Sequence, residues 1–462
     1  MTGVRTQTAV GSIASPAFRA PDAVTFLTVY LVLLWAIPSN RSIPSLGSAG
    51  TVALLWGLVA LVLWCYFLLL RANPELFRRP NPVRAAELVF IGAALASYIA
   101  AMTRAIPGDE INPADTGLIR LAGWAGILFI AADGITSFAR LLTLARRIVF
   151  GGTLLAALGT VQFFTGQSFV DLLVIPGLTT GDGYLSVDIR GGLVRSAGTA
   201  THPLEYGLVL SMILPVALTL AMREKNRWFV VRWLPVGLIV LGLVLSGSRS
   251  SIIGLLVGVA VLAPTWTRGQ RLTLAAGAVA FVGVTYVIAP RVINNFRYLF
   301  IATGTDSSSS SRASSLGFAV DFFERAPFFG RGFGTFQPQY QILDNQLLLL
   351  AVEIGLVGVL AFLAVCVTAV VCSITAARGL SARHDPLVRG LGFALGGSVL
   401  AGTVLLALFD GLSFPQAAGT VFLFLGLSGA YWRLARAESR AEAGAEAGTG
   451  AGALPPAPAR AS

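Results

Sequence analysis

Charged residues are scarce in this sequence. Only 12% of its 462 residues are Asp, Glu, Lys or Arg, whereas 55% are hydrophobic. A soluble globular protein carries about 25% charged residues, so the composition excludes a string of soluble domains, although the length alone allows two or three. The sequence therefore indicates one large body that crosses a membrane many times. The net charge of +11 fits orientation in a membrane better than nucleic-acid binding.

Cysteine and histidine are also rare. Cys65, Cys366 and Cys372 each lie inside an apolar run, which is typical of small core residues and not of a disulfide framework or a metal site. His202 and His384 are the only histidines, too few for a zinc cluster. We therefore expect neither a metal ion nor another cofactor.

Long apolar runs fill most of the chain. A membrane-spanning helix needs about 20 mostly apolar residues. With that window the sequence predicts about twelve spans, at roughly 23–38, 51–70, 85–102, 117–135, 148–165, 203–221, 232–247, 250–264, 272–289, 345–375, 390–409 and 416–433. The predicted fold class is an all-α membrane protein, a polytopic bundle of about twelve transmembrane helices.

Basic residues, almost all of them arginine, gather in alternate connections between these runs. With the N-terminus in the cytoplasm, 22 of the 33 basic residues fall in cytoplasmic segments, as the positive-inside rule requires. Both termini are then cytoplasmic. The predicted parts are a cytoplasmic segment at 1–22, a multi-pass membrane domain at 23–433 and a cytoplasmic tail at 434–462, whose low-complexity end indicates disorder.

Two long loops are predicted on the outer, extracytoplasmic face, at 166–202 and 290–343. Loops of this length are more often functional or disordered than simple connections. The second loop holds a Ser-rich piece, TGTDSSSSSRASS, for which we expect mobility. The next stretch, LGFAVDFFER, has the apolar spacing of a short interfacial helix.

Three places on this predicted outer face hold polar or charged groups beside apolar runs. They are the stretch DIRGGLVRSAGTATHPLEYG, the turn SGSRSSIIG, and the start of DNQLLLLAVEIGLVG. The candidate residues in these places, and in the loop before the third, are Arg190, Arg195, His202, Glu205, Arg249, Arg312, Arg325, Arg331, Asp344 and Asn345.

The arginines suit a phosphate or diphosphate. A planar guanidinium binds oxyanions through two hydrogen bonds and stays charged. Arg249 stands in a tight turn between two apolar helices, where arginine is costly, so we favour a functional role for it and for Arg195. For Arg190 we favour a loop or lipid-headgroup contact over a substrate contact. His202 and Glu205 also fit structural roles at the start of a helix.

Asp344 has two interpretations. It can cap the helix that begins with the next residues, a common use of aspartate, or it can accept a proton from a reacting hydroxyl. Glu353 lies nine residues further on, about 13 Å along a regular helix and on its opposite face. We therefore expect Glu353 to contact a neighbouring helix and not to share the chemistry of Asp344.

The glycines in GRGFG (residues 330–334) do not indicate a nucleotide-binding loop. Such a loop follows a strand and opens a helix in a βαβ unit, and here the surroundings are a predicted loop at the membrane surface. We expect Gly330, Gly332 and Gly334 to shape a turn.

Together these pieces resemble the O-antigen ligase family and its relatives among bacterial polysaccharide polymerases. The resemblance covers roughly residues 190–365 and is carried by RSAGTATHPLEYG, SGSRSSIIG, and PFFGRGFGTF followed by DNQLLLLAVEIGLVG. The family signature is a histidine, an amide or serine, nine residues, and G-x-x-G. Asn345, the nine residues after it, and Gly355-Leu-Val-Gly358 match that spacing, whereas Asp344 stands at the histidine position.

The resemblance implies a metal-independent, inverting membrane glycosyltransferase of about twelve helices in the bacterial cytoplasmic membrane. Its donor is a glycan on a polyprenyl diphosphate carrier in the outer leaflet, and its acceptor is a hydroxyl of a glycan or glycolipid. The implied diphosphate-binding residues are Arg195 and Arg249, and Asp344 is the catalytic candidate.

Other functions stay open. A repeat-unit polymerase uses the same chemistry with a second lipid-linked glycan as acceptor. A transporter or flippase of lipid-linked glycans is the alternative of another class, although transporters tend to place polar groups near the membrane midplane, and here they gather at one predicted face. Two arginine-bearing motifs argue against a purely structural subunit.

Overall fold

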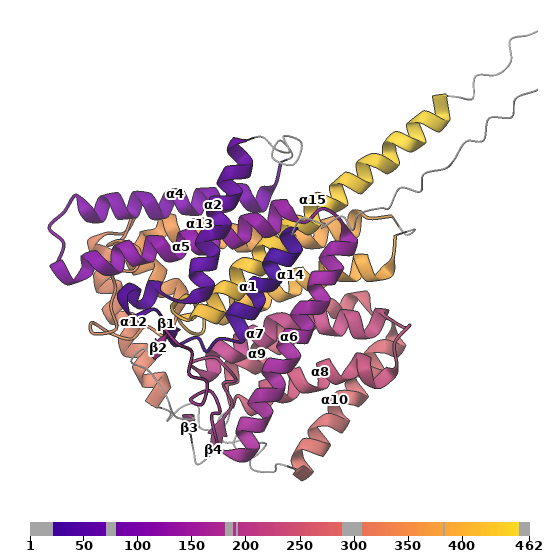
Figure 1. Ribbon diagram of the computed structural model, residues 1–462, viewed down its shortest axis with the longest axis horizontal. Helices are drawn as coiled ribbons and strands as arrows, with labels where there is room; N and C mark the ends of the chain where they lie inside the picture. Colours follow the sequence, from indigo (N-terminus) through magenta and orange to yellow (C-terminus); the bar gives the residue numbers. More distant parts are fainter. Residues whose placement is uncertain are drawn as a thin grey trace, which may run out of the picture.

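The computed structural model describes residues 22–70, 80–180, 188–190, 193–288, 307–381 and 384–451. Helices make up almost all of these residues (Figure 1). In chain order they are α1 (Ala23–Trp35), α2 (Val52–Leu69), α4 (Pro82–Met102), α5 (Gly108–Gly134), α6 (Phe138–Thr165), α7 (Pro203–Arg223), α8 (Phe229–Leu245), α9 (Arg249–Leu262), α10 (Arg268–Ile288), α12 (Ser307–Arg325), α13 (Gln346–Gly379), α14 (Pro386–Leu406) and α15 (Pro415–Ala451). Three short 3-10 helices are η1 (Pro44–Ala49), η2 (Ala263–Thr265) and η4 (Gly411–Ser413).

Eight of the helices in the described part are long and apolar enough to cross a membrane, namely α2, α4, α5, α6, α7, α10, α13 and α14. Each of the twelve predicted apolar runs coincides with a helix, but α1, α8 and α9 are shorter. The 13 residues of α1 span about 20 Å at 1.5 Å per residue, less than the ~30 Å apolar core of a bilayer. The prediction of a helical multi-pass protein is confirmed, whereas the count of twelve spans stays a prediction.

Helices α7 and α15 form the centre of the bundle. Nearly all of α7 from Pro203 to Met222 is buried, as is most of α15 from Gln416 to Ala435. A helix that is apolar on all sides belongs in the interior of a large protein. Helix α14 packs against both of them, α5 and α13 pack against α15, and α8 and α9 pack against α7.

Buried polar groups tie four helices together at one end of the bundle. The carboxylate of Asp133 near the end of α5 accepts hydrogen bonds from Arg84 Nη1 at 2.8 Å and from Trp64 Nε1 at 3.0 Å. Arg433 of α15 donates from Nε to the carbonyl of Ala132 at 3.1 Å. Each of these groups has a partner, as buried polar groups require, so α2, α4, α5 and α15 are held in one register.

Two short antiparallel ladders lie at the other side of the bundle (Figure 1). Strand β1 (Arg41–Ser42) pairs with β2 (Thr179–Thr180). Strand β3 (Asp188–Arg190) pairs with β4 (Leu193–Arg195). The first ladder fastens the segment after α1 to the predicted loop 166–202, and the second leads the chain toward α7.

The structure differs from the sequence-based expectation in the Ser-rich piece. Helix α12 begins at Ser307 and so includes these serines, whereas we expected them to be mobile. Its later residues are anchored, because Ala319 is buried and Phe318 and Phe322 pack against Phe336. Extending an anchored helix adds one hydrogen bond for each residue fixed, which accounts for the serine turns.

The predicted disordered tail also begins later than expected. Helix α15 continues past residue 433 to Ala451, and in Figure 1 its final turns leave the bundle. The stretch LARAESRAEA is rich in Ala, Glu and Arg, which have high helix propensity, and it is held by hydrogen bonds from His384 to Glu438 and from Ser381 to Glu442. Residues 452–462 lie outside the described residues, as do 1–21.

Helix α13 is broken at Gly355, where φ is 66° and ψ is −171°. The amide N–H groups of Leu356 and Val357 donate to the carbonyls of Pro327 and Phe328. The carbonyls of Val352 and Glu353, their normal helical acceptors, instead accept from Arg331 at 3.1 Å and from Gly332 at 2.7 Å. The loop 326–336 therefore replaces two helical hydrogen bonds with four of its own.

Glycines make this close contact possible. Gly330, Gly332 and Gly334 have φ of 66°, 119° and 81°, and such left-handed conformations favour glycine. A Cβ on Gly330 would lie 2.3 Å from the carbonyl oxygen of Glu353, and one on Gly355 would lie 2.4 Å from the backbone of Phe328. The expected turn at GRGFG is present, and its backbone is hydrogen-bonded to the broken helix.

Gly355→Ala should destabilise the protein strongly. The φ and ψ of Gly355 fall in a region that is essentially restricted to glycine, where strain costs about 1–3 kcal/mol, and the methyl group would also overlap Phe328. Thermal unfolding in detergent measures the effect. Gly277→Ala in α10 is the matched control, because a Cβ there meets nothing within 4 Å. Equal melting temperatures for Gly355→Ala and the wild type would contradict this account.

Candidate functional site

Arg195, at the end of β4, lies against the turn between α8 and α9. Its side chain is buried, and Nε donates to the carbonyl of Ser246 at 3.0 Å. A Cβ on Gly247, which has φ of 59°, would lie 3.3 Å from Cγ of Arg195. The structure therefore brings Arg195 together with the turn that carries the second predicted arginine.

Arg249 is the first residue of α9, directly after Ser248 at the N-cap position. The serines of this turn are bonded to one another, with Ser246 Oγ 3.1 Å from Ser251 Oγ and Ser248 Oγ 2.7 Å from Ser250 Oγ. The N-terminus of a helix favours an anion, because unpaired N–H groups and the helix dipole both point outward. Arg195, Arg249 and this helix start add positive potential at one place.

The start of α7 lies beside this turn. His202 is the N-cap of α7, and its Nδ1 accepts from the amide of Leu204 at 3.1 Å. Its ring also packs against Phe414, with 5.9 Å between centroids. His202 therefore has the structural role at the start of a helix that the sequence allows.

Glu205 is buried and bonded to three elements. One carboxylate oxygen accepts from the amide of Gln416 at 2.7 Å, and the other accepts from the amide of Thr201 at 2.8 Å and from Ser39 Oγ at 2.9 Å. We expected Glu205 to favour the start of its own helix, and it lies in the first turn of α7 and accepts from Thr201 just before that helix. It also accepts from the first turn of α15, so it joins the starts of α7 and α15.

The short segment 410–416 links the two halves of the candidate site. At its far end Gln416 is held by Glu205. In its middle the amide of Leu412 donates to Oε1 of Gln346, the first residue of α13, at 2.8 Å. The segment 410–416 therefore contacts both the start of α13 and the start of α7.

Asp344 lies immediately before α13, but it does not cap this helix. The cap is Asn345, whose side-chain oxygen accepts from the amides of Leu347 at 2.9 Å and Leu348 at 3.1 Å. The prediction of a capping role for Asp344 is wrong, because the neighbouring amide already satisfies the first-turn donors. Among the described residues, the Asp344 carboxylate makes no hydrogen bond or ion pair, so it is available for other contacts.

Asp410 is a second carboxylate at this place, and the sequence analysis missed it. Burial, together with the charge of Asp344, raises the pKa of Asp410 from its ordinary 3.8 to about 6. The negative charge of Asp344 disfavours the ionised form of Asp410, as a like charge does. Asp410 falls between two apolar runs, so the only signal in the sequence was an acid at the predicted mouth of a span.

Arg331 belongs to a different cluster. Its guanidinium pairs with the buried carboxylate of Glu110 and lies 4.6 Å from the ring centre of Phe322. Tyr340 donates to the same carboxylate at 2.7 Å, and this bond raises the pKa of Tyr340 above its ordinary range. Arg325 is exposed and lies 5.2 Å from the Phe322 ring. These contacts hold the loop 326–336 against α5 and account for Arg331 without a substrate.

Two predicted contacts cannot be placed. Arg190 lies in β3 and Arg312 in α12, but their side chains lie outside the described part of the chain.

Arg120 in α5 was also missed, although an arginine inside an apolar run is a functional signal. It lines a cavity of about 960 Å³ together with Glu353 and Asp410. The carboxylate of Glu353 accepts at 3.3 Å from the amide of Phe336. Its backbone carbonyl accepts from Ser97 Oγ of the neighbouring helix α4 at 3.0 Å, so the expected contact with a neighbouring helix is present together with a contact to the loop after Gly334. Within the described residues, no three His, Cys, Asp or Glu side chains are grouped as potential metal ligands.

The α8–α9 turn and the broken helix α13 share one recognisable segment. Residues 234–363 match the family model described as O-antigen ligase. The resemblance drawn from the motifs is confirmed over this segment. No curated protein matches the sequence.

The O-antigen ligase segment holds Arg249, Asp344 and Gly355, whereas Arg195, Arg120 and Asp410 lie outside it. The family implies a glycosyltransferase or ligase type of enzyme, with lipid-linked glycans as substrates and polysaccharide biosynthesis as its setting. With several apolar helices long enough to span a bilayer, the chain is a multi-pass membrane protein.

Asp410→Asn should change how stability depends on pH. Between about pH 4 and pH 6 the folded protein holds a proton on Asp410 that the unfolded chain has lost, so stability falls as pH rises through this range. The loss amounts to about 3 kcal/mol at most, at 1.36 kcal/mol per pKa unit. Asparagine does not ionise, so the variant does not lose this stability. Its melting temperature should equal that of the wild type near pH 4 and exceed it at pH 7.5. If the difference in melting temperature between Asp410→Asn and the wild type were the same at pH 4 and pH 7.5, it would contradict a raised pKa of Asp410.

Proposed function

We propose that this protein is a membrane glycosyltransferase similar to the O-antigen ligases. It transfers a glycan from a polyprenyl diphosphate carrier to an acceptor hydroxyl at the outer face of the bacterial cytoplasmic membrane. The observation that carries the proposal is the contact between Arg195 and the Ser246–Ser248 turn that leads to Arg249, inside or beside the O-antigen ligase segment.

The arginine turn supplies positive charge where the leaving group becomes negative. When the bond between the anomeric carbon and the diphosphate oxygen breaks, its electron pair stays on the diphosphate. Arg195, Arg249 and the start of α9 stabilise that charge, and donors fixed in advance are an effective source of catalysis. No metal ion is needed in this scheme.

Asp344 supplies the proton acceptor. The acceptor oxygen attacks the anomeric carbon from the side opposite to the diphosphate, which inverts the configuration, and its proton passes to the Asp344 carboxylate. Asn345 takes the capping hydrogen bonds, so both oxygens of Asp344 can face the acceptor. The charge of Asp344 acts on Asp410, so the two carboxylates lie in the same part of the protein.

A repeat-unit polymerase is the second candidate, because it needs the same leaving group and the same base. Reconstitution of the full chain in lipid nanodiscs decides between these candidates. An undecaprenyl diphosphate-linked glycan is added with either a second lipid-linked glycan or a lipid-core glycan as acceptor. Release of undecaprenyl diphosphate with product formation supports transfer. In liposomes, movement of the donor between leaflets without any new glycosidic bond would instead identify a transporter.

Arg249→Lys should lose most of the activity in this assay. Lysine keeps the charge but lacks the planar pair of donors, and Arg249→Ala should lower turnover about 10²–10³-fold, as expected for a lost oxyanion donor. Initial rates at equal amounts of inserted protein measure the effect. Arg268→Ala is the control, because Arg268 is exposed at the start of α10. Near-normal turnover of Arg249→Ala would refute the role.

Asp344→Asn should lower turnover at least about 10²-fold without loss of stability. The variant keeps the size of the side chain and leaves the Asn345 cap in place, but it removes the proton acceptor. Asn345→Ala makes the opposite change, since it should cost about 1 kcal/mol of stability while the Asp344 carboxylate remains. Turnover and melting temperature of both variants are compared with the wild type. Normal turnover of Asp344→Asn would remove Asp344 from the chemistry.

A further inference from the structure

The cavity of about 960 Å³ is separate from the arginine turn. Its walls are α5, the segment 45–49, the loop 333–343, the first turns of α13 and the segment 410–413. Neither Arg195 nor Arg249 lines it. Much of the wall therefore comes from outside the segment that matches the O-antigen ligase family.

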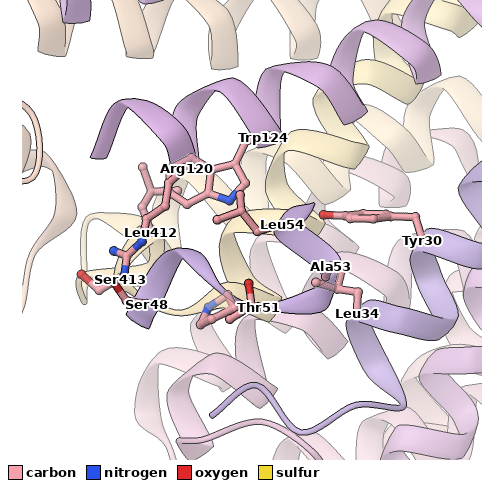
Figure 2. A pocket seen from close by; sticks show the side chains of 12 residues that line it. Tyr30, Leu34, Ser48, Thr51, Ala53, Leu54, Arg120, Trp124, Leu412 and Ser413 are labelled. Atoms are coloured by element: carbon pink, nitrogen blue, oxygen red, sulfur yellow. The ribbon is translucent and has the colours of Figure 1, made fainter. Parts of the chain in front are cut away.

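Arg120 is the cation of this cavity. Figure 2 shows its side chain reaching from α5 toward Ser48 and Ser413, where a smaller hollow adjoins. Within the part of the chain that the structure describes, its guanidinium makes no hydrogen bond or ion pair. The charge of Glu353 acts on Arg120 from a greater distance than an ion pair. An arginine in an apolar helix is costly unless it serves a site or a pathway, so its donors point to a ligand.

The rest of the wall is suited to a sugar and not to a diphosphate. Asp115, Glu353 and Asp410 line the cavity with Arg120, so the lining has a single guanidinium among three carboxyl groups and lacks the several cations that a diphosphate requires. Thr116 offers a hydroxyl, and Trp124 and Phe336 offer flat apolar faces. A pocket of this size with a few placed polar groups among apolar ones is typical of a small-molecule site.

The cavity also opens beside the proposed base. Leu343 and Gln346, on either side of Asp344 in the sequence, both line it, and so does Asp410. A sugar held there lies against Asp410 and beside the backbone that carries Asp344. The diphosphate of the donor, in contrast, needs the arginine turn.

We propose that this cavity binds the sugar of the acceptor, and that Arg120 donates hydrogen bonds to its hydroxyl oxygens. The inference rests on the proposed function, because an acceptor exists only if a glycan is transferred. The hydroxyl-rich sugar of the donor has the same chemistry, and the experiment separates the two sources.

Two probes test the site, one that contains only sugar and one that contains only the lipid diphosphate. The first is a lipid-free oligosaccharide cut from the surface polysaccharide of the host cell, and the second is undecaprenyl diphosphate without sugar. Binding to the full chain in nanodiscs is followed through tryptophan fluorescence, since Trp124 lines the cavity. Arg120→Ala should weaken oligosaccharide binding at least 10-fold and leave undecaprenyl diphosphate binding unchanged. Arg249→Ala should show the reverse pattern.

Ser48→Phe provides a second variant, because Ser48 is exposed and lines the cavity. It should block oligosaccharide binding without disturbing the packed helices, and Arg268→Ala should bind both probes normally. Intact undecaprenyl diphosphate binding shows that each variant is folded. Absence of oligosaccharide binding by the wild type, or unchanged binding by Arg120→Ala and Ser48→Phe, would overturn the proposal.

The transfer assay then separates acceptor from donor. Arg120→Ala should raise the KM for the acceptor at least 10-fold and change the KM for the lipid-linked donor less than twofold. A rise in the donor KM alone would overturn the acceptor assignment. If the wild type shows no transfer but binds the oligosaccharide through Arg120, the proposed function fails while the sugar site stands. If the wild type transfers the glycan and Arg120→Ala leaves the KM for the acceptor unchanged, the proposed function stands and the sugar site fails.

Discussion

The exchange of hydrogen bonds at Gly355 is the constraint on which the site depends. Two helical bonds of α13 are given up, and the loop 326–336 supplies four others in their place. This exchange fixes the loop that carries Phe336, which in turn holds the carboxylate of Glu353. It also sets where the first turns of α13 run, and therefore where Asp344 and Gln346 lie. A regular helix through Gly355 would leave the loop backbone without these partners, and buried backbone groups without partners are costly.

Two groups of charged residues make up the candidate site. Arg195 and Arg249 belong to the turn at the start of α9. Asp410 lines the large cavity together with Arg120, and Asp344 directly precedes the start of α13. In the proposed function the first group holds the diphosphate and Asp344 accepts the proton. Glu205 has a different use, because its carboxylate is buried against the start of α15 and holds the bundle together.

The sequence was informative where the signal is local. Apolar runs predicted the helices, GRGFG predicted a glycine-dependent turn, and the signature around Asn345 led to the family. It was much less informative where two distant segments meet. Asp410 and Arg120 each stand alone in the sequence, and only the fold brings α5, η1, the 410–413 segment and the first turns of α13 to one cavity, where both residues meet Glu353. The capping interpretation of Asp344 could not be decided from the sequence for a related reason, since Asp and Asn are equally good caps and only the local backbone selects Asn345.

The two walls of the cavity differ in how firmly they are held. The wall formed by the loop 326–336 is hydrogen-bonded to α13, and Arg331 fastens it to Glu110. The wall formed by η1 has no buried residue, and the β1–β2 ladder beside it is only two residues long. Segments with few buried contacts open at low free energy. The η1 side is therefore the wall of the cavity that can move at the lower cost in free energy, while the wall beside α13 stays hydrogen-bonded.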